Sequence, residues 1–61
     1  MSEPITVMIV DDHEMVRRGA IGYLEAQTNL SVIAEAENGV DAIRLAGEHV
    51  PDVVLMDLVM P

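Results

Sequence analysis

The 61-residue sequence predicts an α/β fold, a doubly wound parallel sheet with helices on both faces. Two short apolar runs, Ile5–Val10 and Val53–Met56, have the length and composition of strands that are buried on both faces. Between them lie two segments with helical periodicity and one further strand-like segment. The order is therefore strand, helix, strand, helix, strand, and right-handed crossovers make such a sheet parallel.

The first predicted strand, Ile5–Val10, is interrupted only by Thr6, which is β-branched and compatible with a strand. Asp11, Asp12 and His13 follow the strand and end it. We expect Asp12 to cap the helix that comes next, because aspartate is among the favoured N-cap residues.

The segment from Glu14 to about Gln27 predicts an amphipathic helix. Positions at spacings of three and four residues form one stripe that should face the core, and its members are Val16, Ala20, Tyr23, Leu24 and Gln27. Glu14 in the first turn interacts favourably with the helix dipole. Thr28 and Asn29 are expected to end the helix.

The middle strand, Leu30–Glu37, has charges on one of its faces. Strict alternation places Val32, Ala34 and Ala36 on one face and Ile33, Glu35 and Glu37 on the other. A strand with this pattern is half exposed, so we expect it at an edge of the sheet. The two glutamates should then keep that edge soluble.

Asn38 and Gly39 predict a turn, with Asn38 as a candidate N-cap. The second helix should cover Val40–His49, and its inward positions are expected to be Val40, Ile43 and either Ala46 or Gly47. Pro51 and Asp52 then end it, and Val53–Met56 forms the last strand. With the middle strand outside, the spatial order of the strands should be 2-1-3.

Three aspartates follow the two buried runs: Asp11 and Asp12 after the first, and Asp57 after the last. In the order 2-1-3 these strands are neighbours, and ligands of open parallel sheets bind at the carboxyl ends of the strands. Carboxylate oxygens suit Mg²⁺, which is often held together with phosphate oxygens. A carboxylate can also be the nucleophile toward a phosphoryl group. Acids at strand ends are also common as solvated loop residues or helix caps, so spacing alone leaves both interpretations open.

The composition disfavours several classes of protein. Eleven acidic residues against three arginines give a net charge of −8, which disfavours direct binding of nucleic acid by this segment. No cysteine is present, so no disulfide stabilises the chain. The N-terminus lacks the features of a signal peptide, and no apolar run approaches the roughly 20 residues of a membrane span. We expect a cytoplasmic protein without a membrane partner.

Three motifs, in order, resemble the receiver domain of bacterial two-component response regulators: Val10–Gly19, Ala36–Gly39 and Pro51–Pro61. The first two are similar in particular to the NarL/FixJ (LuxR-type) transcriptional regulators. The resemblance covers nearly the whole chain and implies a flavodoxin-like (CheY-like) fold. Residues 1–61 would then be a partial receiver domain. The rest of the receiver and a C-terminal helix-turn-helix domain would be expected beyond them.

The resemblance also implies roles for individual residues. Asp57 matches the phosphoacceptor. Asp12 matches the carboxylate that binds Mg²⁺ directly, together with Asp57 and the backbone carbonyl of Val59, and Asp11 matches the acid that holds the ion mainly through water. The phosphoryl donor would be a sensor histidine kinase or a small donor such as acetyl phosphate. The switch hydroxyl and the lysine that complete the family's site are missing from this sequence, which contains no lysine at all.

The whole protein would then be a phosphorylated transcription regulator rather than an enzyme, acting as a homodimer and reaching DNA only through the C-terminal domain. Two other functions stay open. A phosphatase with an aspartate nucleophile usually carries a second acid two residues later, but that position is Val59 here. A non-catalytic Mg²⁺-binding or interaction fragment is the third interpretation.

Three further residues are expected to have modest roles. His13 should be a loop residue that helps to start the first helix. Arg17 and Arg18 should lie on a solvated helix face, and contact with a kinase or a second receiver is the alternative.

Overall fold

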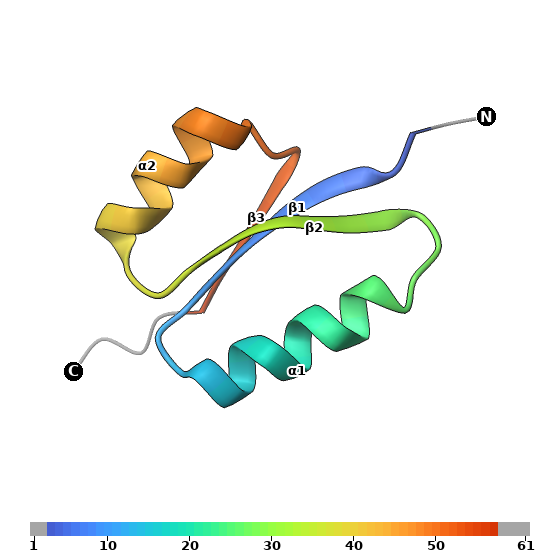
Figure 1. The fold of residues 1–61 in the computed structure, drawn as a ribbon, viewed down its shortest axis with the longest axis horizontal. Coiled ribbons are helices and arrows are strands. Elements are labelled where there is room, and N and C mark those ends of the chain that lie inside the picture. The colour runs from blue at the N-terminus through green and yellow to red at the C-terminus, as the bar shows by residue number, and fades with distance from the viewer. Residues whose placement is uncertain (1–2, 58–61) are drawn as a thin grey trace.

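The computed structural model describes residues 3–57 and contains the expected elements in the expected order (Figure 1). They are β1 (Ile5–Asp11), α1 (Glu14–Glu25), β2 (Leu30–Ala36), α2 (Gly39–His49) and β3 (Val53–Asp57). All strand pairs are parallel, and β1 lies between the other two in the order β2-β1-β3. The predicted α/β architecture and the predicted strand order 2-1-3 are thereby confirmed.

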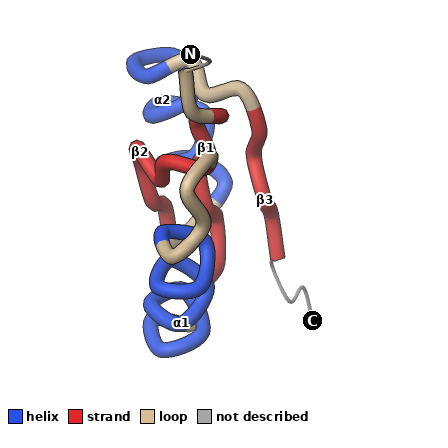
Figure 2. The backbone as a smooth tube through the Cα atoms, turned by 90° about the vertical axis from the view of Figure 1, so that its right-hand side faces the viewer, coloured by secondary structure: helices blue, strands red, loops and turns tan. Residues whose placement is uncertain are grey.

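The helices lie on opposite faces of the sheet, so the fold has three layers (Figure 1). In this view the sheet is seen close to its edge, with α2 above it and α1 below. After a rotation of 90°, β3 stands on the side of the sheet away from β2 (Figure 2). Neither helix of residues 3–57 has the length and apolar character that crossing a membrane requires.

The core is centred on β1, in which the five residues Val7–Asp11 are buried. Successive side chains of a strand point to opposite faces, so β1 contributes apolar groups to both layers, as expected for a strand buried on two sides. On the α2 side, Met8 and Val10 pack with Ala36 and Ala42. Leu45 and two further alanines surround this cluster, and such small side chains allow α2 to approach the sheet closely.

Helix α1 presents a different face to the core from the one expected. Ala20 and Leu24 are half-buried, in agreement with the expected stripe. Tyr23, however, is 71% exposed, and Val16 is also exposed. Gln27 lies beyond the end of the helix at Glu25. The buried residue of this helix is Arg17.

Helix α2 shows the same kind of departure. Ala42 is buried and Leu45 and Ala46 are half-buried, whereas Val40 and Ile43 are 80% and 79% exposed. Of the expected inward positions, only Ala46 is therefore correct. Both helices pack on β1 and β2 and make no comparable contact with β3. Each helix is thus rotated toward β2, which leaves part of the predicted stripe on the β3 side.

Strand β2 is an edge strand, as predicted, but its alternation is broken. Val7 pairs with Val32, and the next residue, Met8, pairs with Ala34, so Ile33 has no register partner. Because Val7 and Met8 point to opposite faces, their partners do so as well. The expectation that Val32 shares a face with Ala34 is therefore wrong, and the physical reason is this bulge.

The helix N-termini also divide into a correct and an incorrect prediction. Asn38 caps α2, and its side-chain oxygen accepts a hydrogen bond from the N–H of Asp41 at 2.9 Å. The N-cap of α1 is His13, not Asp12, and the His13 side chain makes no cap hydrogen bond. Asp11 accepts the N–H of His13 instead, so the carboxylate before the expected one organises this turn.

Candidate functional site

The carboxyl ends of β1 and β3 bring two of the predicted acids together. Asp11 and Asp57 are register partners in the last step of the β1–β3 ladder. Asp12 follows directly, in the connection between β1 and α1. The backbone therefore brings the three aspartates together at the carboxyl end of the sheet. Val59, whose carbonyl was expected to join them, lies outside the described residues.

Asp11 is a buried carboxylate whose orientation is set by the turn that follows it. Its side chain is only 6% exposed, and Oδ1 accepts the backbone N–H of His13 at 2.8 Å. A bond of this type, from an aspartate to the backbone two residues later, is a local turn motif. It satisfies one carboxylate oxygen of a group that is costly to bury without partners.

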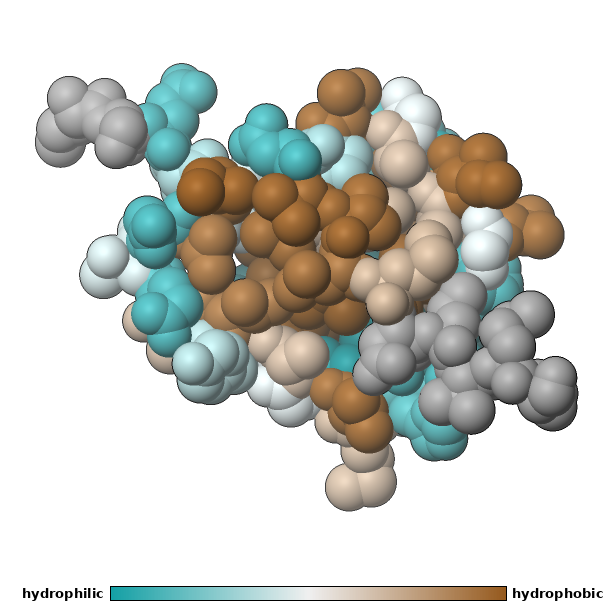
Figure 3. Space-filling view, turned by 180° about the vertical axis from the view of Figure 1, so that it is seen from behind, coloured by the Kyte–Doolittle hydropathy of each residue, from teal (hydrophilic) through white to brown (hydrophobic). Residues whose placement is uncertain are grey.

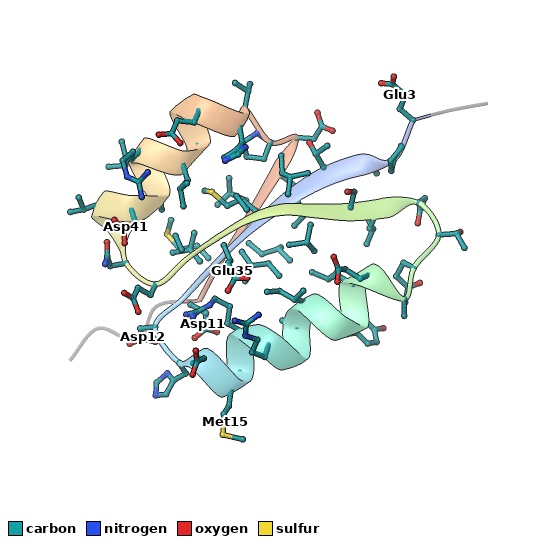
Figure 4. The ribbon with its side chains drawn as sticks, viewed as in Figure 1. Glu3, Asp11, Asp12, Met15, Glu35 and Asp41 are labelled. Carbon is teal, nitrogen blue, oxygen red and sulfur yellow. The ribbon has the colours of Figure 1, made fainter. Side chains whose placement is uncertain are left out.

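Asp12 is more accessible than Asp11, with 40% of its side chain exposed. Asp12 Oδ1 lies 2.9 Å from Nδ1 of His13, and Asp11 Oδ1 lies 3.9 Å from the same nitrogen. Within residues 3–57, possible ligand atoms of these three residues all lie within 4.8 Å of one another. Figure 4 shows Asp11 and Asp12 together at the end of β1, beside the start of α1.

The donor set fits a small, hard cation. Two carboxylates, one buried and one accessible, offer the oxygen ligands that Mg²⁺ prefers, and the backbone of Asp57 lies beside them. His13 lies at the N-cap of α1, where it was expected to help start the helix, and its ring pairs with Asp12. Imidazole is more typical of transition-metal sites, so the oxygen atoms carry this assignment.

Arg17 is a residue that sequence reasoning misplaced. It is 8% exposed rather than on a solvated face. Its Nη1 donates to the backbone carbonyl of Asp11 at 2.7 Å, and its Nε donates to Oε1 of Glu35 at 2.9 Å. The neighbouring Arg18 is exposed, as expected, and lies 3.8 Å from Oε2 of Glu35. Arg17 is therefore hydrogen-bonded to the backbone of Asp11, the first residue of the acidic turn.

Glu35 consequently has a different role from the one predicted for it. It is half-buried and paired with Arg17 rather than serving only the solubility of the edge, while Glu37 is exposed. Two signals in the sequence are consistent with this pair. Arg17 precedes Leu24 by seven residues, and therefore lies on the same helix face, and Glu35 is on the charged face of β2.

A second polar contact fixes β3 at the opposite end of β1. Asp52 Oδ2 accepts both the backbone N–H and the hydroxyl of Thr6, each at 3.0 Å. These two hydrogen bonds, the backbone one first, lower the pKa of Asp52. In return, the N–H of Asp52 donates to the hydroxyl and carbonyl oxygens of Thr6. This contact sets the register that ends with Asp57 beside Asp11.

Comparison with known proteins gives a consistent picture. Residues 7–61 match the family described as the response regulator receiver domain. The chain is 57% identical over 56 residues to the transcriptional regulatory protein LiaR of Bacillus subtilis, which covers 92% of this chain and 26% of the relative. It is 53% identical over 57 residues to the response regulator protein VraR of Staphylococcus saprophyticus, covering 93% and 27% of the two chains.

A solved structure shows the same fold. The signal receiver domain of a NarL response regulator from Mycobacterium tuberculosis superimposes with a TM-score of 0.90 and 37% sequence identity. The match covers 98% of this chain and 48% of that one. The expected flavodoxin-like (CheY-like) arrangement is thereby confirmed for these elements. The chain spans about a quarter of the length of the curated relatives that it matches.

Proposed function

The chain belongs to the response regulator receiver domains of the NarL/LuxR type, and we propose that it carries the metal-binding and phosphoacceptor part of such a receiver. Asp57 is the proposed phosphoacceptor, with Asp11 and Asp12 as metal-binding residues. The observation that carries this proposal is the register of the sheet, which pairs Asp11 with Asp57 and leaves Asp12 in the adjoining turn.

The two acids of the turn have different surroundings, which supports different roles. Asp12 is the more accessible carboxylate and is proposed to bind Mg²⁺ directly, with Asp57 and the carbonyl of Val59. Asp11 is buried, and one of its oxygens is engaged by the N–H of His13, so it is proposed to act mainly through water. A bound Mg²⁺ would offset the repulsion between the carboxylates and an incoming phosphoryl group.

The proposed reaction is a phosphoryl transfer to Asp57. A carboxylate oxygen of Asp57 attacks the phosphorus, an O–P bond forms, and the bond between phosphorus and the donor breaks. The donor is the phosphohistidine of a sensor histidine kinase, and its imidazole ring is the leaving group, which takes up one proton from water and becomes neutral. With acetyl phosphate, acetate is the leaving group. Asp11 and Asp12 serve to hold the ion and do not take part in bond formation.

The remaining steps belong to the whole protein. Phosphorylation is proposed to favour a homodimer that binds DNA through a C-terminal helix-turn-helix domain, in the cytoplasm. Two of the relatives support an output of this kind by name, since they are called transcriptional regulatory proteins.

The test uses a receiver fusion, in which the 56 matching residues of this chain replace the corresponding segment of the Bacillus subtilis LiaR. The fusion is treated with acetyl phosphate and Mg²⁺ and its intact mass is measured. We expect an increase of one phosphate that is absent from Asp57→Asn. Rapid multiple turnover of acetyl phosphate without a lasting adduct would indicate a phosphatase instead. An Mg²⁺ affinity that Asp12→Ala leaves unchanged would refute the metal assignment.

A further inference from the structure

Asp11 and Arg17 are the two charged residues that are buried among residues 3–56, and the Arg17 side chain contacts the backbone of Asp11. We propose that Arg17 is a positioning residue for the metal site, holding the turn that carries Asp11 and Asp12 in its binding conformation. The inference rests on the proposed function, because it concerns the same two acids. It assigns a role to a side chain that touches neither the ion nor the phosphoryl group.

Arg17 contacts the turn from two directions. Its Nη1 donates to the carbonyl of Asp11 at 2.7 Å, and its own backbone N–H donates to the carbonyl of His13 at 2.9 Å. Asp12 lies between these two anchored carbonyls. The carbonyl of Asp11 belongs to the planar peptide unit that joins Asp11 to Asp12. Holding this carbonyl in one direction therefore fixes the orientation of the peptide plane that leads into Asp12.

The guanidinium is itself held in place by Glu35 of β2. Nε donates to Oε1 of Glu35 at 2.9 Å while Nη1 donates to Asp11. The donors of a guanidinium lie in one rigid plane, so fixing Nε also fixes the direction of Nη1. A lysine has no comparable pair of donors. The chain of contacts therefore runs from β2 through Arg17 to the peptide before Asp12.

The position of Arg17 points to a geometric role rather than to a surface contact. Its side chain is 10% exposed, whereas that of Arg18 is 65% exposed. A kinase or a second receiver would meet Arg18 first. Replacing Arg17 with a neutral residue leaves Glu35 without its partner and makes the surroundings of the turn more negative, which by itself would strengthen the attraction for a cation. A loss of Mg²⁺ affinity would therefore come from the arrangement of the turn. Arg18 is therefore a matched control, one residue away with the same charge.

The experiment measures Mg²⁺ affinity of the receiver fusion by calorimetry for Arg17→Met, Arg17→Lys, Glu35→Gln and Arg18→Met. Groups that orient metal ligands typically change affinity about 10- to 100-fold when they are removed. We expect about a tenfold weakening in Arg17→Met and a smaller one in Arg17→Lys, which keeps one donor. Arg18→Met should stay within about twofold of the parent. Glu35→Gln, which keeps an acceptor for Nε but loses the charge that pairs with Arg17, should fall between the parent and Arg17→Met.

A second readout separates positioning from general loss of stability. The amide resonance of His13 reports the bond from its N–H to Asp11, so it should shift in metal-free Arg17→Met and not in Arg18→Met. Leu24→Ala, on the same helix but away from the turn, serves as a destabilised control. Equal losses of Mg²⁺ affinity in Leu24→Ala and Arg17→Met would overturn the positioning role. If Arg17→Met does not fold, the comparison is made with Arg17→Lys.

Failure of this inference and failure of the proposed function give different results. If the parent fusion binds Mg²⁺ and is phosphorylated, but folded Arg17→Met and Arg17→Lys bind the ion equally well, the positioning role is wrong and the proposed function stands. If the parent itself binds no Mg²⁺, the proposed function is wrong, and the role of Arg17 with it.

Discussion

Strands β2 and β3 flank the same central strand, yet their surroundings differ. Both helices pack on β2. The charged face of β2 is held against α1 by the ion pair between Glu35 and Arg17. In the part of the chain that the structure describes, β3 pairs with β1, and neither helix packs closely on it. Its residues Val53–Met56 are 41–60% exposed, although they are entirely apolar. The faces of β2 are therefore covered by the helices, whereas β3 is uncovered and apolar.

The uncovered side continues onto both helices. On the α2 face, Ile43 and Val54 line a hollow of about 360 Å³, and on the α1 face, Val16 and Leu55 line another of about 300 Å³. Seen from behind, the molecule presents a broad apolar area (Figure 3). The two halves of the site therefore differ in how they are supported. The turn with Asp11 and Asp12 is held by Arg17, which is itself paired with Glu35 of β2. Strand β3, which leads to Asp57, is held mainly by its backbone pairing with β1.

The largest expected effect comes from truncating the core beside the covered edge. Met8 is fully buried, so Met8→Ala should lower the free energy of unfolding by about 2–5 kcal/mol. Val54 is partly exposed, and Val54→Ala should cost about 1 kcal/mol or less. Urea unfolding of the 61-residue chain provides both values, at a concentration below that at which it associates and with trimethylamine N-oxide added to favour the folded state. Equal costs would show that β3 is as well packed as β1.

The uncovered edge should make the 61-residue chain associate with itself. An apolar strand with a free edge invites pairing with another chain. Leu55→Lys should weaken this association at least tenfold, or by about 1.4 kcal/mol. Sedimentation velocity over a range of concentrations measures the effect, and Ser31→Lys on β2 is the control that should change little. A parent chain that stays monomeric at all concentrations would contradict the contrast between the edges.

The approach to β3 contains a strained residue whose replacement should stabilise the chain. Val50 caps α2 with φ at 47°, in the left-handed region that a β-branched residue disfavours. Its side chain is exposed, so Val50→Gly loses little packing and should gain about 1 kcal/mol. Val40→Gly, within the helix, should instead lose about 1 kcal/mol. Thermal unfolding of both variants checks the opposite signs.

The smallest effect concerns the contact that aligns β3 with β1. The backbone N–H and then the hydroxyl of Thr6 lower the pKa of Asp52 from its ordinary value of 3.8. A group whose pKa is lower in the folded state stabilises the fold above the unfolded pKa, and this contribution is lost as the pH falls through the folded pKa. Asp52→Asn should therefore lose less stability than the parent on acidification below 3.8.

The pH dependence of unfolding, measured by circular dichroism, tests this expectation. Glu48→Gln is the control, because Glu48 is an exposed acid on α2, far along the chain from Thr6. The same acid dependence in Asp52→Asn and the parent would remove Asp52 from the account of how β3 is aligned.

The amino-acid sequence was sufficient to predict the elements, their order in space and the position of Asp11 and Asp57 in the fold. Apolar runs predict buried strands because a charged side chain is costly to bury. The charged face of Leu30–Glu37 identified the edge strand. The order 2-1-3 then followed, and with it the meeting of Asp11 and Asp57. These features depend on composition along one segment at a time, which a sequence displays directly.

Only the tertiary structure decided which side of each helix is covered, that Arg17 is buried and that β2 is bulged at Ile33. Helical spacing shows which residues share a face, but the rotation of a helix about its axis depends on what it packs against. Arg17 is buried because Glu35, 18 residues away, and the carbonyl of Asp11 both satisfy its donors. Such a set of partners exists only once the chain has folded.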